Sequence, residues 1–173
     1  STKVETLVSL SDFYARRQDY RSLLAVTRKL FLADNLPLEM KIKRFENFTS
    51  DTRFYREYYF QLNDLASILA IHYPKEPKVV ELYAGHLIAS GELEMALDLY
   101  KNHLDDQPPV EEYYAAVIDI ESYLQHPDSV EKYVTRGLQL FPDRIGFHLS
   151  KGHVMNQMKQ YDRAIKAYRE SQR

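Results

Sequence analysis

Apolar residues recur at helical spacing along most of the chain, and short polar stretches predict where each helix ends. In "PKVVELYAGHLIASGELEMALDLYKNHLDDQP" this spacing predicts a helix over about 77–89, a turn at Ser90 and Gly91, and a helix over about 93–104. Pro108 follows, and the residue before a proline avoids the helical region. The segment is therefore predicted to form a helical hairpin.

The two segments that follow predict the same hairpin. "VEEYYAAVIDIESYLQHPDSVEKYVTRGLQLFP" should turn at "QHPDS", where Asp128 would cap the second helix and Glu131 would complete a capping box. "DRIGFHLSKGHVMNQMKQYDRAIKAYRESQR" should turn near "MKQYD". Gly152 is expected where the first helix comes close to its partner, because a small residue lets two backbones approach.

These hairpins share one period. Three sets of positions recur at the same constant spacing: Pro74, Pro108 and Pro142; Ala96, Val130 and Ala164; and Tyr100, Val134 and Tyr168. A fixed period of about 34 residues indicates an array of repeated structural units, in which each unit buries its apolar face against its neighbours.

Particular residues within the period match the tetratricopeptide repeat. The matching positions, in order and spacing, are Gly91, Leu93, Ala96, Leu97, Tyr100 and Pro108 in one unit and Gly152, Tyr161, Ala164, Ile165 and Tyr168 in another. The sequence over 77–173 thus resembles the tetratricopeptide repeat family. The resemblance implies an all-α fold, a right-handed α-α superhelix or solenoid of helix-turn-helix hairpins, in which Ala96 and Ala164 are buried where paired helices cross.

The first part of the chain is less regular. A hairpin with its turn at "QDY" is predicted first, then a short helix at "EMKIKRFENF", a break at "TSD" and a second helix of roughly 20 residues. The whole chain, 1–173, is interpreted as one repeat domain of five hairpins, over 4–37, 38–76, 77–110, 111–144 and 145–173. Because the next proline of the period would fall near 176, we expect a fragment of a longer repeat protein.

Composition narrows the function without identifying it. Lys and Arg number 23 and Asp and Glu 25, so the formal net charge of −2 provides no global attraction to nucleic acid or an anionic membrane. Residues 61–110 are nevertheless acidic, with 3 basic and 8 acidic side chains. No apolar run approaches the length of a membrane span, and the absence of Cys excludes thiol chemistry. Composition leaves the compartment open between the cytoplasm and the periplasm or export.

Residues with catalytic or metal-binding chemistry are not grouped in the sequence. His148 and His153 are five positions apart, which places them on different sides of a helix. Glu111 and Glu112 stand at a helix start, where carboxylates favour the helix dipole. Because there is also no Gly-rich phosphate loop and no nucleophile motif, we expect no enzyme activity, no cofactor, no metal and no small-molecule substrate.

The basic stretch 41–56 leaves a nucleic-acid alternative open. Its Lys and Arg residues are interleaved with aromatic residues, the combination that binds single-stranded nucleic acid. On a helix, however, Ile42, Phe45 and Phe48 form an apolar stripe, with Lys and Arg on the other face. A solvated basic face is the favoured interpretation.

The resemblance implies that the first helix of each hairpin lines a concave groove that binds peptide or protein segments. The expected groove positions are Lys78, Glu81, Gly85, Ile88, Glu112, Ala115, Asp119, Tyr123, Leu149, His153 and Asn156. Glu81, Gly85, Ala115 and Asp119 occupy the places where a carboxylate clamp presents Lys, Asn and Arg. A carboxylate clamp is therefore disfavoured, and the groove would suit a neutral or basic segment. The predicted function is a non-catalytic protein-interaction scaffold. The alternative is an assembly module that self-associates through its C-terminal repeat.

Overall fold

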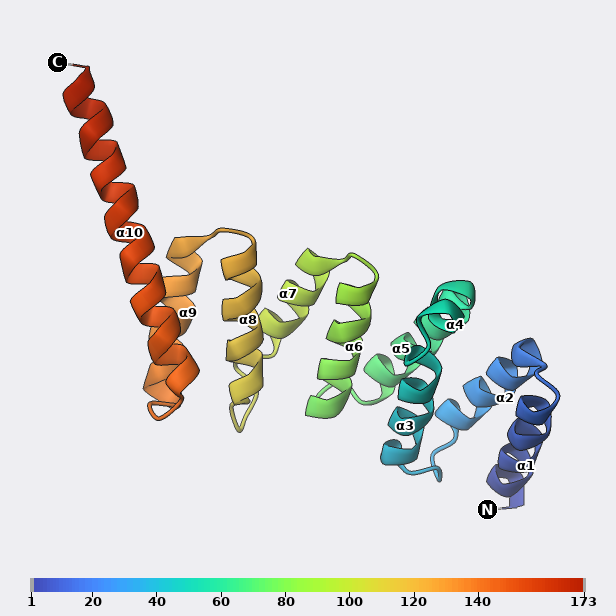
Figure 1. Cartoon of the computed structure of the whole chain (residues 1–173). Helices are drawn as coiled ribbons and strands as arrows, with labels where there is room; N and C mark the ends of the chain where they lie inside the picture. The colour runs from blue at the N-terminus through green and yellow to red at the C-terminus, as the bar shows by residue number, and fades with distance from the viewer. Residues whose placement is uncertain (1, 173) are drawn as a thin grey trace. The chain divides into compact units, whose positions relative to one another are not determined.

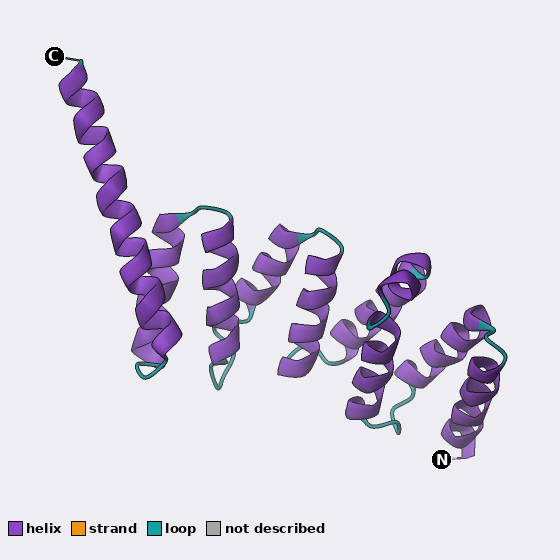
Figure 2. Cartoon of the chain, in the orientation of Figure 1, coloured by secondary structure: helices purple, strands orange, loops and turns teal. Residues whose placement is uncertain are grey.

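The computed structural model describes residues 2–172, and all the regular structure of these residues is helical (Figures 1 and 2). The helices are α1 (Thr2–Arg16), α2 (Tyr20–Leu32), α3 (Leu38–Thr49), α4 (Thr52–Glu57), α5 (Tyr59–His72), α6 (Pro77–Ala89), α7 (Leu93–Asn102), α8 (Glu111–Tyr123), α9 (Pro127–Leu140) and α10 (Ile145–Ser171). No helix within 2–172 combines the length and the apolar character that crossing a membrane requires.

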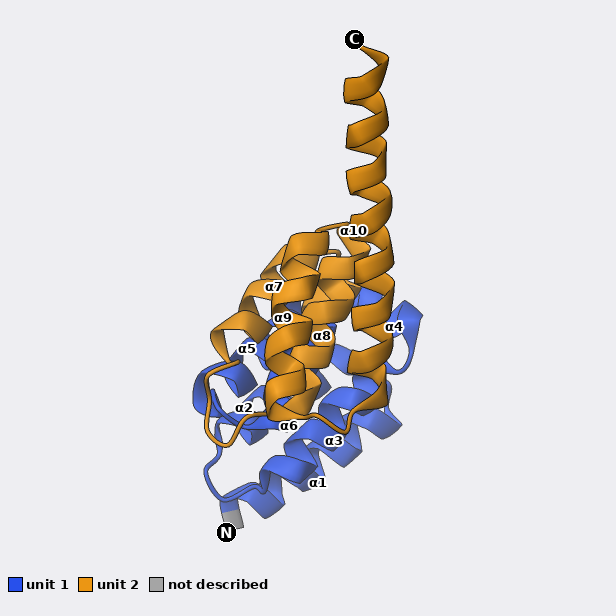
Figure 3. Ribbon diagram, turned by 90° about the vertical axis from the view of Figure 1, so that its left-hand side faces the viewer, with its two compact units in different colours: residues 1–86 blue, residues 87–173 orange. Residues whose placement is uncertain are grey.

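The chain divides into two compact units, residues 1–86 and residues 87–173, which Figure 3 distinguishes by colour. The division falls within α6. In the first unit α1 packs on α2, and α5 packs on both α2 and α3. In the second unit α7 packs on α8, α8 on α9, and α9 on α10. Consecutive helices therefore pair, as the sequence predicted for a helical repeat.

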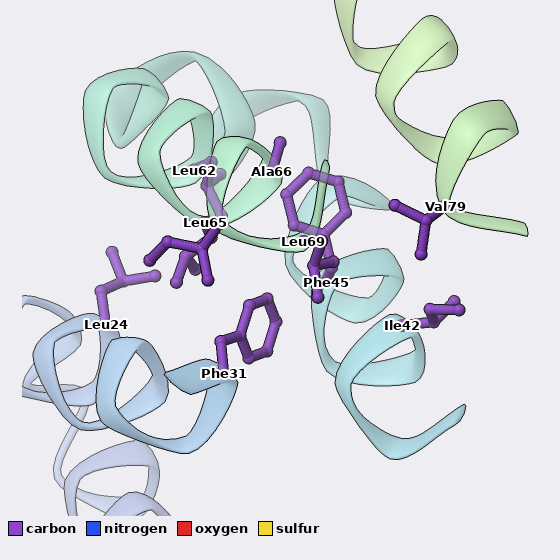
Figure 4. Packing of buried hydrophobic residues seen from close by; sticks show 10 residues of the cluster. Leu24, Phe31, Ile42, Phe45, Leu62, Leu65, Ala66, Leu69 and Val79 are labelled. Atoms are coloured by element: carbon purple, nitrogen blue, oxygen red, sulfur yellow. The ribbon is translucent and has the colours of Figure 1, made fainter. Parts of the chain in front are cut away.

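The main core of the first unit gathers buried apolar side chains from four helices (Figure 4). They are Leu24 and Phe31 from α2, Ile42 and Phe45 from α3, Leu62, Leu65, Ala66, Ile68 and Leu69 from α5, and Val79 from α6. Each set has helical spacing, so each helix directs one face inward. Burial of such side chains stabilises a helix that its intrinsic propensity alone would not hold.

The predicted second helix of 38–76 is interrupted. Asp51 directly precedes α4 and caps it. Its Oδ1 accepts hydrogen bonds from the backbone N–H groups of Arg53 (3.0 Å) and Phe54 (3.2 Å). The helix then stops at Tyr58, where φ is −106° and ψ is 32°, and α5 starts at the next residue. The rings of Phe54 and Tyr58 lie against Tyr20 of α2, at 5.2 and 6.0 Å between centroids. Tertiary packing of aromatic rings accompanies this break, and the local pattern did not signal it.

The second unit has the predicted register from α7 to α9. Gly91 turns the chain before α7 with φ of +80°, and Gln125, one period later, does so before α9 with φ of +60°. The repeat positions Ala96 and Tyr100 are 0% and 4% exposed, and Val130 and Val134 of the next unit are 4% and 1% exposed. The buried positions recur with the period because each pair of helices meets its neighbours in the same way.

The predicted cap of α9 is wrong. α9 begins at Pro127, with His126 as its N-terminal flanking residue, and no side chain caps this end. Asp128 therefore lies inside the first turn rather than before it. Proline favours this position, since its fixed φ suits a helix start and its missing N–H would have no partner there. The carboxylate of Asp128 remains near the positive end of the helix dipole.

The predicted final hairpin is also wrong in its second half. α10 is continuous through "MKQYD", so no turn separates residues 145–157 from 160–171. A Cβ atom added at Gly152 would meet nothing within 4 Å, which shows that no helix approaches it closely. Ala164 is exposed and Tyr168 is 66% exposed. The segment 157–160 contains no Gly or Pro, so local propensity favours a continuous helix.

Candidate functional site: the exposed face of the first helices

The candidate positions on α6 lie on its exposed face. Lys78, Glu81 and Gly85 follow the i, i+3, i+7 spacing of one stripe, and all three are exposed. Val79 and Ala84, which point to other sides of the helix, are 1% and 0% exposed. These three residues belong to the first unit.

Ile88 continues this stripe in the second unit. Its side chain is 45% exposed, although isoleucine favours burial. Ile88 lies three positions after Gly85, the spacing at which side chains of a helix share a face.

The candidate positions on α8 form a second stripe. Glu112, Asp119 and Tyr123 are exposed, and Ala115 between them is half-buried. Tyr123 is 77% exposed, which is high for an aromatic residue in the middle of a chain. The opposite side of α8 is fully packed, with Tyr113, Tyr114, Val117 and Ile118 each at most 2% exposed.

The candidate positions on α10 are likewise exposed. Leu149 is 70% exposed, and His153 and Asn156 are exposed as well. The packed side of this helix carries Phe147, 2% exposed, and Val154, 1% exposed. The ring of Phe147 lies 3.1 Å from where a Cβ atom on Gly137 would be, so Gly137 gives Phe147 its place against α9.

Arg144 connects the stripes of α8 and α10. Its Nη1 donates a hydrogen bond to Oε1 of Glu112 at 3.1 Å and forms an ion pair with Oε1 of Glu111 at the same distance. The hydrogen bond that Arg144 donates to Glu112 is the main reason why the pKa of Arg144 is raised. Partial burial raises the pKa of Asp119, and the charge of Arg144 opposes that shift. The first turn of α10 therefore lies beside α8, and the two stripes are neighbours within the second unit.

Ile145 belongs to this surface, and the sequence analysis did not select it. It is 74% exposed and lies one turn before Leu149, so the two side chains share a face of α10. The i, i+4 spacing from Leu149 was the signal that could have identified it. Ile145 and Leu149 lie in the first turns of α10, beside the start of α8, whereas Asp119 and Tyr123 lie in the last turns of α8. We call this set of four residues the α8/α10 face.

The side chains of the α8/α10 face can make non-covalent contacts with another molecule. Within 2–172, no three His, Asp or Glu side chains lie close enough to hold a metal ion. His148 and His153 lie on different sides of α10, and Nε2 of His148 is hydrogen-bonded to the backbone oxygen of Pro142 at 2.7 Å. The α8/α10 face offers apolar contact area and one carboxylate, which can bind a side chain of opposite character.

The prediction that the Lys and Arg residues of stretch 41–56 form a solvated face is wrong for Lys41. Lys41 is 1% exposed, because its ammonium group donates hydrogen bonds to the backbone oxygen of Ala33 (2.7 Å) and the hydroxyl of Tyr73 (2.8 Å). These two acceptors compensate for its burial. Phe45 is 3% exposed, and Phe54 stacks on Phe48 at 5.5 Å. The aromatic rings of this stretch therefore pack within the first unit.

Comparison with solved structures identifies the fold. A crystal structure of MamA, a tetratricopeptide repeat protein, superposes with a TM-score of 0.54 and 11% sequence identity, covering 96% of this chain and 88% of that one. A second structure, of MamA AMB-1 in space group P212121, gives 0.57 and 12%, covering 97% and 89%. No family model matches the sequence, and no curated protein matches it significantly. The predicted all-α fold of tetratricopeptide type is confirmed.

Proposed function

We propose that this chain is a non-catalytic protein-interaction scaffold that binds a peptide or protein segment on the exposed face of its first helices. The observation that carries the proposal is the α8/α10 face. Tyr123, Ile145 and Leu149 are between 70% and 77% exposed on adjacent helices of one unit. Large apolar side chains that stay exposed beside polar residues mark interaction surfaces, and tyrosine is a frequent anchor in them.

The charges on this face suit a neutral or basic segment with an apolar anchor. Glu112 is bound to Arg144, whereas Asp119 lies one turn before Tyr123 on the same face of α8. Partial burial disfavours the charged form of Asp119. An incoming Lys or Arg would stabilise that charge, whereas a carboxylate would be repelled. Ala115 and Asp119 stand where a carboxylate clamp would need cationic or amide donors.

A selection from a phage-displayed library of random dodecapeptides tests the proposal. We expect enrichment of sequences that combine Lys or Arg with an aromatic or aliphatic residue. For a synthetic peptide from the selection, Tyr123→Ala and Asp119→Lys should each weaken binding by about tenfold or more. Phe60→Ala is the matched control, because Phe60 is an exposed aromatic residue (83%) on α5, in the other unit. The absence of enrichment, or equal loss in all three variants, would contradict the proposal.

The nucleic-acid alternative has less support. Lys41 is buried among hydrogen-bond acceptors, and the aromatic residues near it pack against one another. The half-buried rings of Phe48 and Phe54 already stack on each other, which leaves less ring surface for bases. Titration with a single-stranded oligonucleotide at two salt concentrations separates the two functions, since binding through residues 41–56 would fall steeply as salt increases.

A further inference from the structure

The apolar stripe that packs α10 against α9 continues into the second half of α10. Phe147 and Val154 are 2% and 1% exposed, and the ring of Phe147 lies against Gly137 of α9. Four further apolar residues follow Val154 at steps of three or four positions, the spacing that keeps side chains on one side of a helix. They are Met158, Tyr161, Ile165 and Tyr168. We call these four residues the exposed α10 stripe.

The exposed α10 stripe is open to solvent in a single copy of the chain. Tyr161 and Tyr168 are 67% and 66% exposed, and Met158 and Ile165 are half-buried. Figure 1 shows the second half of α10 extending beyond the ends of α8 and α9. Because the stripe has the same phase as the part that α9 covers, it is the side on which a further helix can pack.

The two edges of the exposed α10 stripe differ in charge and size. On one edge Asp162 and Arg169 line a surface depression together with Ile165. Within residues 2–172, neither of these two charges forms an ion pair. The other edge carries the small residues Ala164 and Ser171, both exposed. One edge therefore offers two opposite charges, and the other lets a neighbouring helix approach closely.

We propose that a second copy of the chain covers the exposed α10 stripe, through antiparallel packing of the second halves of the two α10 helices. When the two-fold axis passes between Ala164 and Ile165, Tyr161 of each copy opposes Tyr168 of the other. Each helix uses one side only, and Phe147 stays packed on α9 of its own copy. The dimer is closed, because the same surface of each copy meets the other.

The edges of the exposed α10 stripe are the reason for assigning a second copy as the partner. A two-fold axis between antiparallel helices places like edges side by side. Asp162 of each copy then lies within one turn of Arg169 of the other, which gives two equivalent ion pairs in each dimer. On the other edge the Ala164 residues of the two copies lie side by side, and their small size permits close packing. A parallel pair would set the charged edge against the small edge and lose both ion pairs.

The contact is short, so the dimer should be weak. It extends over residues 158–171, about 20 Å at a rise of about 1.5 Å per residue, and small interfaces are typical of transient complexes. The pairing does not depend on the α8/α10 face, because Leu149 lies on another side of α10 than Val154 and Tyr161. Failure of the dimer would therefore leave the proposed peptide site untouched.

Cross-linking tests the position of the two-fold axis. The chain contains no Cys, so a single introduced thiol can form a disulfide only with another copy. Ile165→Cys places the two thiols beside the proposed axis. Ala167→Cys is the matched control, because Ala167 is exposed two residues further on, about 200° around the helix. Both proteins are oxidised with glutathione disulfide, and the appearance of covalent dimer is followed by non-reducing electrophoresis.

We expect Ile165→Cys to form the covalent dimer about tenfold faster than Ala167→Cys or more, because a disulfide requires Cα atoms within about 7 Å. Equal rates in the two variants, or no covalent dimer from Ile165→Cys, would overturn the proposal.

A charge exchange tests the antiparallel register independently. Asp162→Arg and Arg169→Asp should each raise the dimer dissociation constant by about threefold or more, because each sets like charges together in both equivalent pairs. The double variant should return the constant to near the wild-type value. Arg163→Asp is the control, since Arg163 is exposed on the opposite side of α10 and its replacement should leave the constant unchanged.

Sedimentation equilibrium up to millimolar concentration measures these constants, and circular dichroism checks that every variant keeps its helicity. A double variant as weak as the single variants would overturn the proposed register. A wild-type protein that stays monomeric at millimolar concentration would overturn the dimer.

Discussion

The ammonium nitrogen of Lys41 lies 2.8 Å from the hydroxyl oxygen of Tyr73, and the same nitrogen lies 2.7 Å from the backbone oxygen of Ala33. Lys41 belongs to α3, Ala33 ends α2, and Tyr73 ends α5. One buried side chain therefore holds three helix segments together, and the aromatic ring of Tyr73 adds a cation–π contact at 5.1 Å.

Replacement of Lys41 should destabilise the first unit. Lys41→Ala removes both hydrogen bonds and leaves the oxygen of Ala33 without this donor, so the free energy of unfolding should fall by about 2 kcal/mol or more. Urea denaturation followed by circular dichroism measures the change. Lys43→Ala is the control, because Lys43 is exposed on the same helix and its loss should cost less than about 0.5 kcal/mol. Equal effects would show that Lys41 is not a structural residue.

His86 should make the first unit sensitive to mild acid. Its Nδ1 accepts a hydrogen bond from the hydroxyl of Tyr55, and its Nε2 donates one to Oδ1 of Asn63 at 2.8 Å. The rings of Tyr55 and Tyr59 stack on the imidazole at 5.7 Å. Burial lowers the pKa of His86 below its ordinary value of 6.5. As the pH falls, the unfolded chain binds this proton before the folded chain does, so stability is full above about pH 6.5 and decreases below it.

The measurement is the melting temperature between pH 7.5 and pH 5. The wild-type protein should lose stability across this range, and His86→Gln should show a flatter profile from a lower starting value. His72→Gln is the control, since His72 is exposed at the end of α5 and its replacement should leave the slope unchanged. If the melting temperature of His86→Gln falls with pH as steeply as that of the wild type, other groups cause the pH dependence.

Glu121 should make the stability of the second unit depend on pH, in a lower range than His86 does for the first unit. It is 1% exposed, 3.2 Å from Nδ1 of His126 and 3.6 Å from Nζ of Lys101. Burial raises the pKa of Glu121, but hydrogen bonds with Ser129 and His126 and the charge of Lys101 outweigh this and hold it below 4.5. The contribution to stability is therefore present above about pH 4.5 and is lost as the pH falls through the pKa of the folded protein.

Glu121→Gln should lower the free energy of unfolding by about 2 kcal/mol at pH 7, because it removes the buried charge that accepts these hydrogen bonds and pairs with Lys101. The difference from wild type should shrink below pH 4.5. Glu131→Gln, at an exposed position of α9, provides the control for loss of one carboxylate. A difference from wild type that is constant across pH would contradict the role assigned to the ionised carboxylate.

Two alanines at equivalent repeat positions should respond differently to enlargement. Ala96 is 0% exposed, so Ala96→Phe should overpack the second unit and cost about 1–3 kcal/mol. Ala164 stands two periods later and is exposed, so Ala164→Phe should leave the stability of the monomer nearly unchanged. Thermal unfolding at low protein concentration compares the two. Equal costs would show that Ala164 is buried within its own chain, as the sequence predicted.

The helices of the second unit were largely predictable from sequence. Gly91 and the spacing of Ala96 and Tyr100 located α7, and the same spacing located α9, because apolar periodicity reflects which face each helix buries. The exposure of the candidate positions on α6, α8 and α10 could be inferred from the same periodicity. Ile145 was missed because one exposed apolar residue is not distinctive until its neighbours are known.

Lys41 and Tyr58 show where sequence reasoning failed. Helical spacing assigned Lys41 to a solvated face, and only the positions of Ala33 and Tyr73 reveal that two acceptors compensate for its burial. Nothing local to Tyr58 signals the break between α4 and α5, which accompanies packing against Tyr20. Both outcomes depend on residues far away along the chain, and a local pattern contains no information about them.

The sequence by itself determined the helical class, the repeat period and the face that each repeat helix buries, because these follow from the spacing of apolar residues along one helix. Only the tertiary structure decided that Lys41 is buried and that Arg144 joins α8 to α10. Each of these depends on what one helix meets on another. A period predicts which face needs a partner, and the structure establishes whether that partner is present.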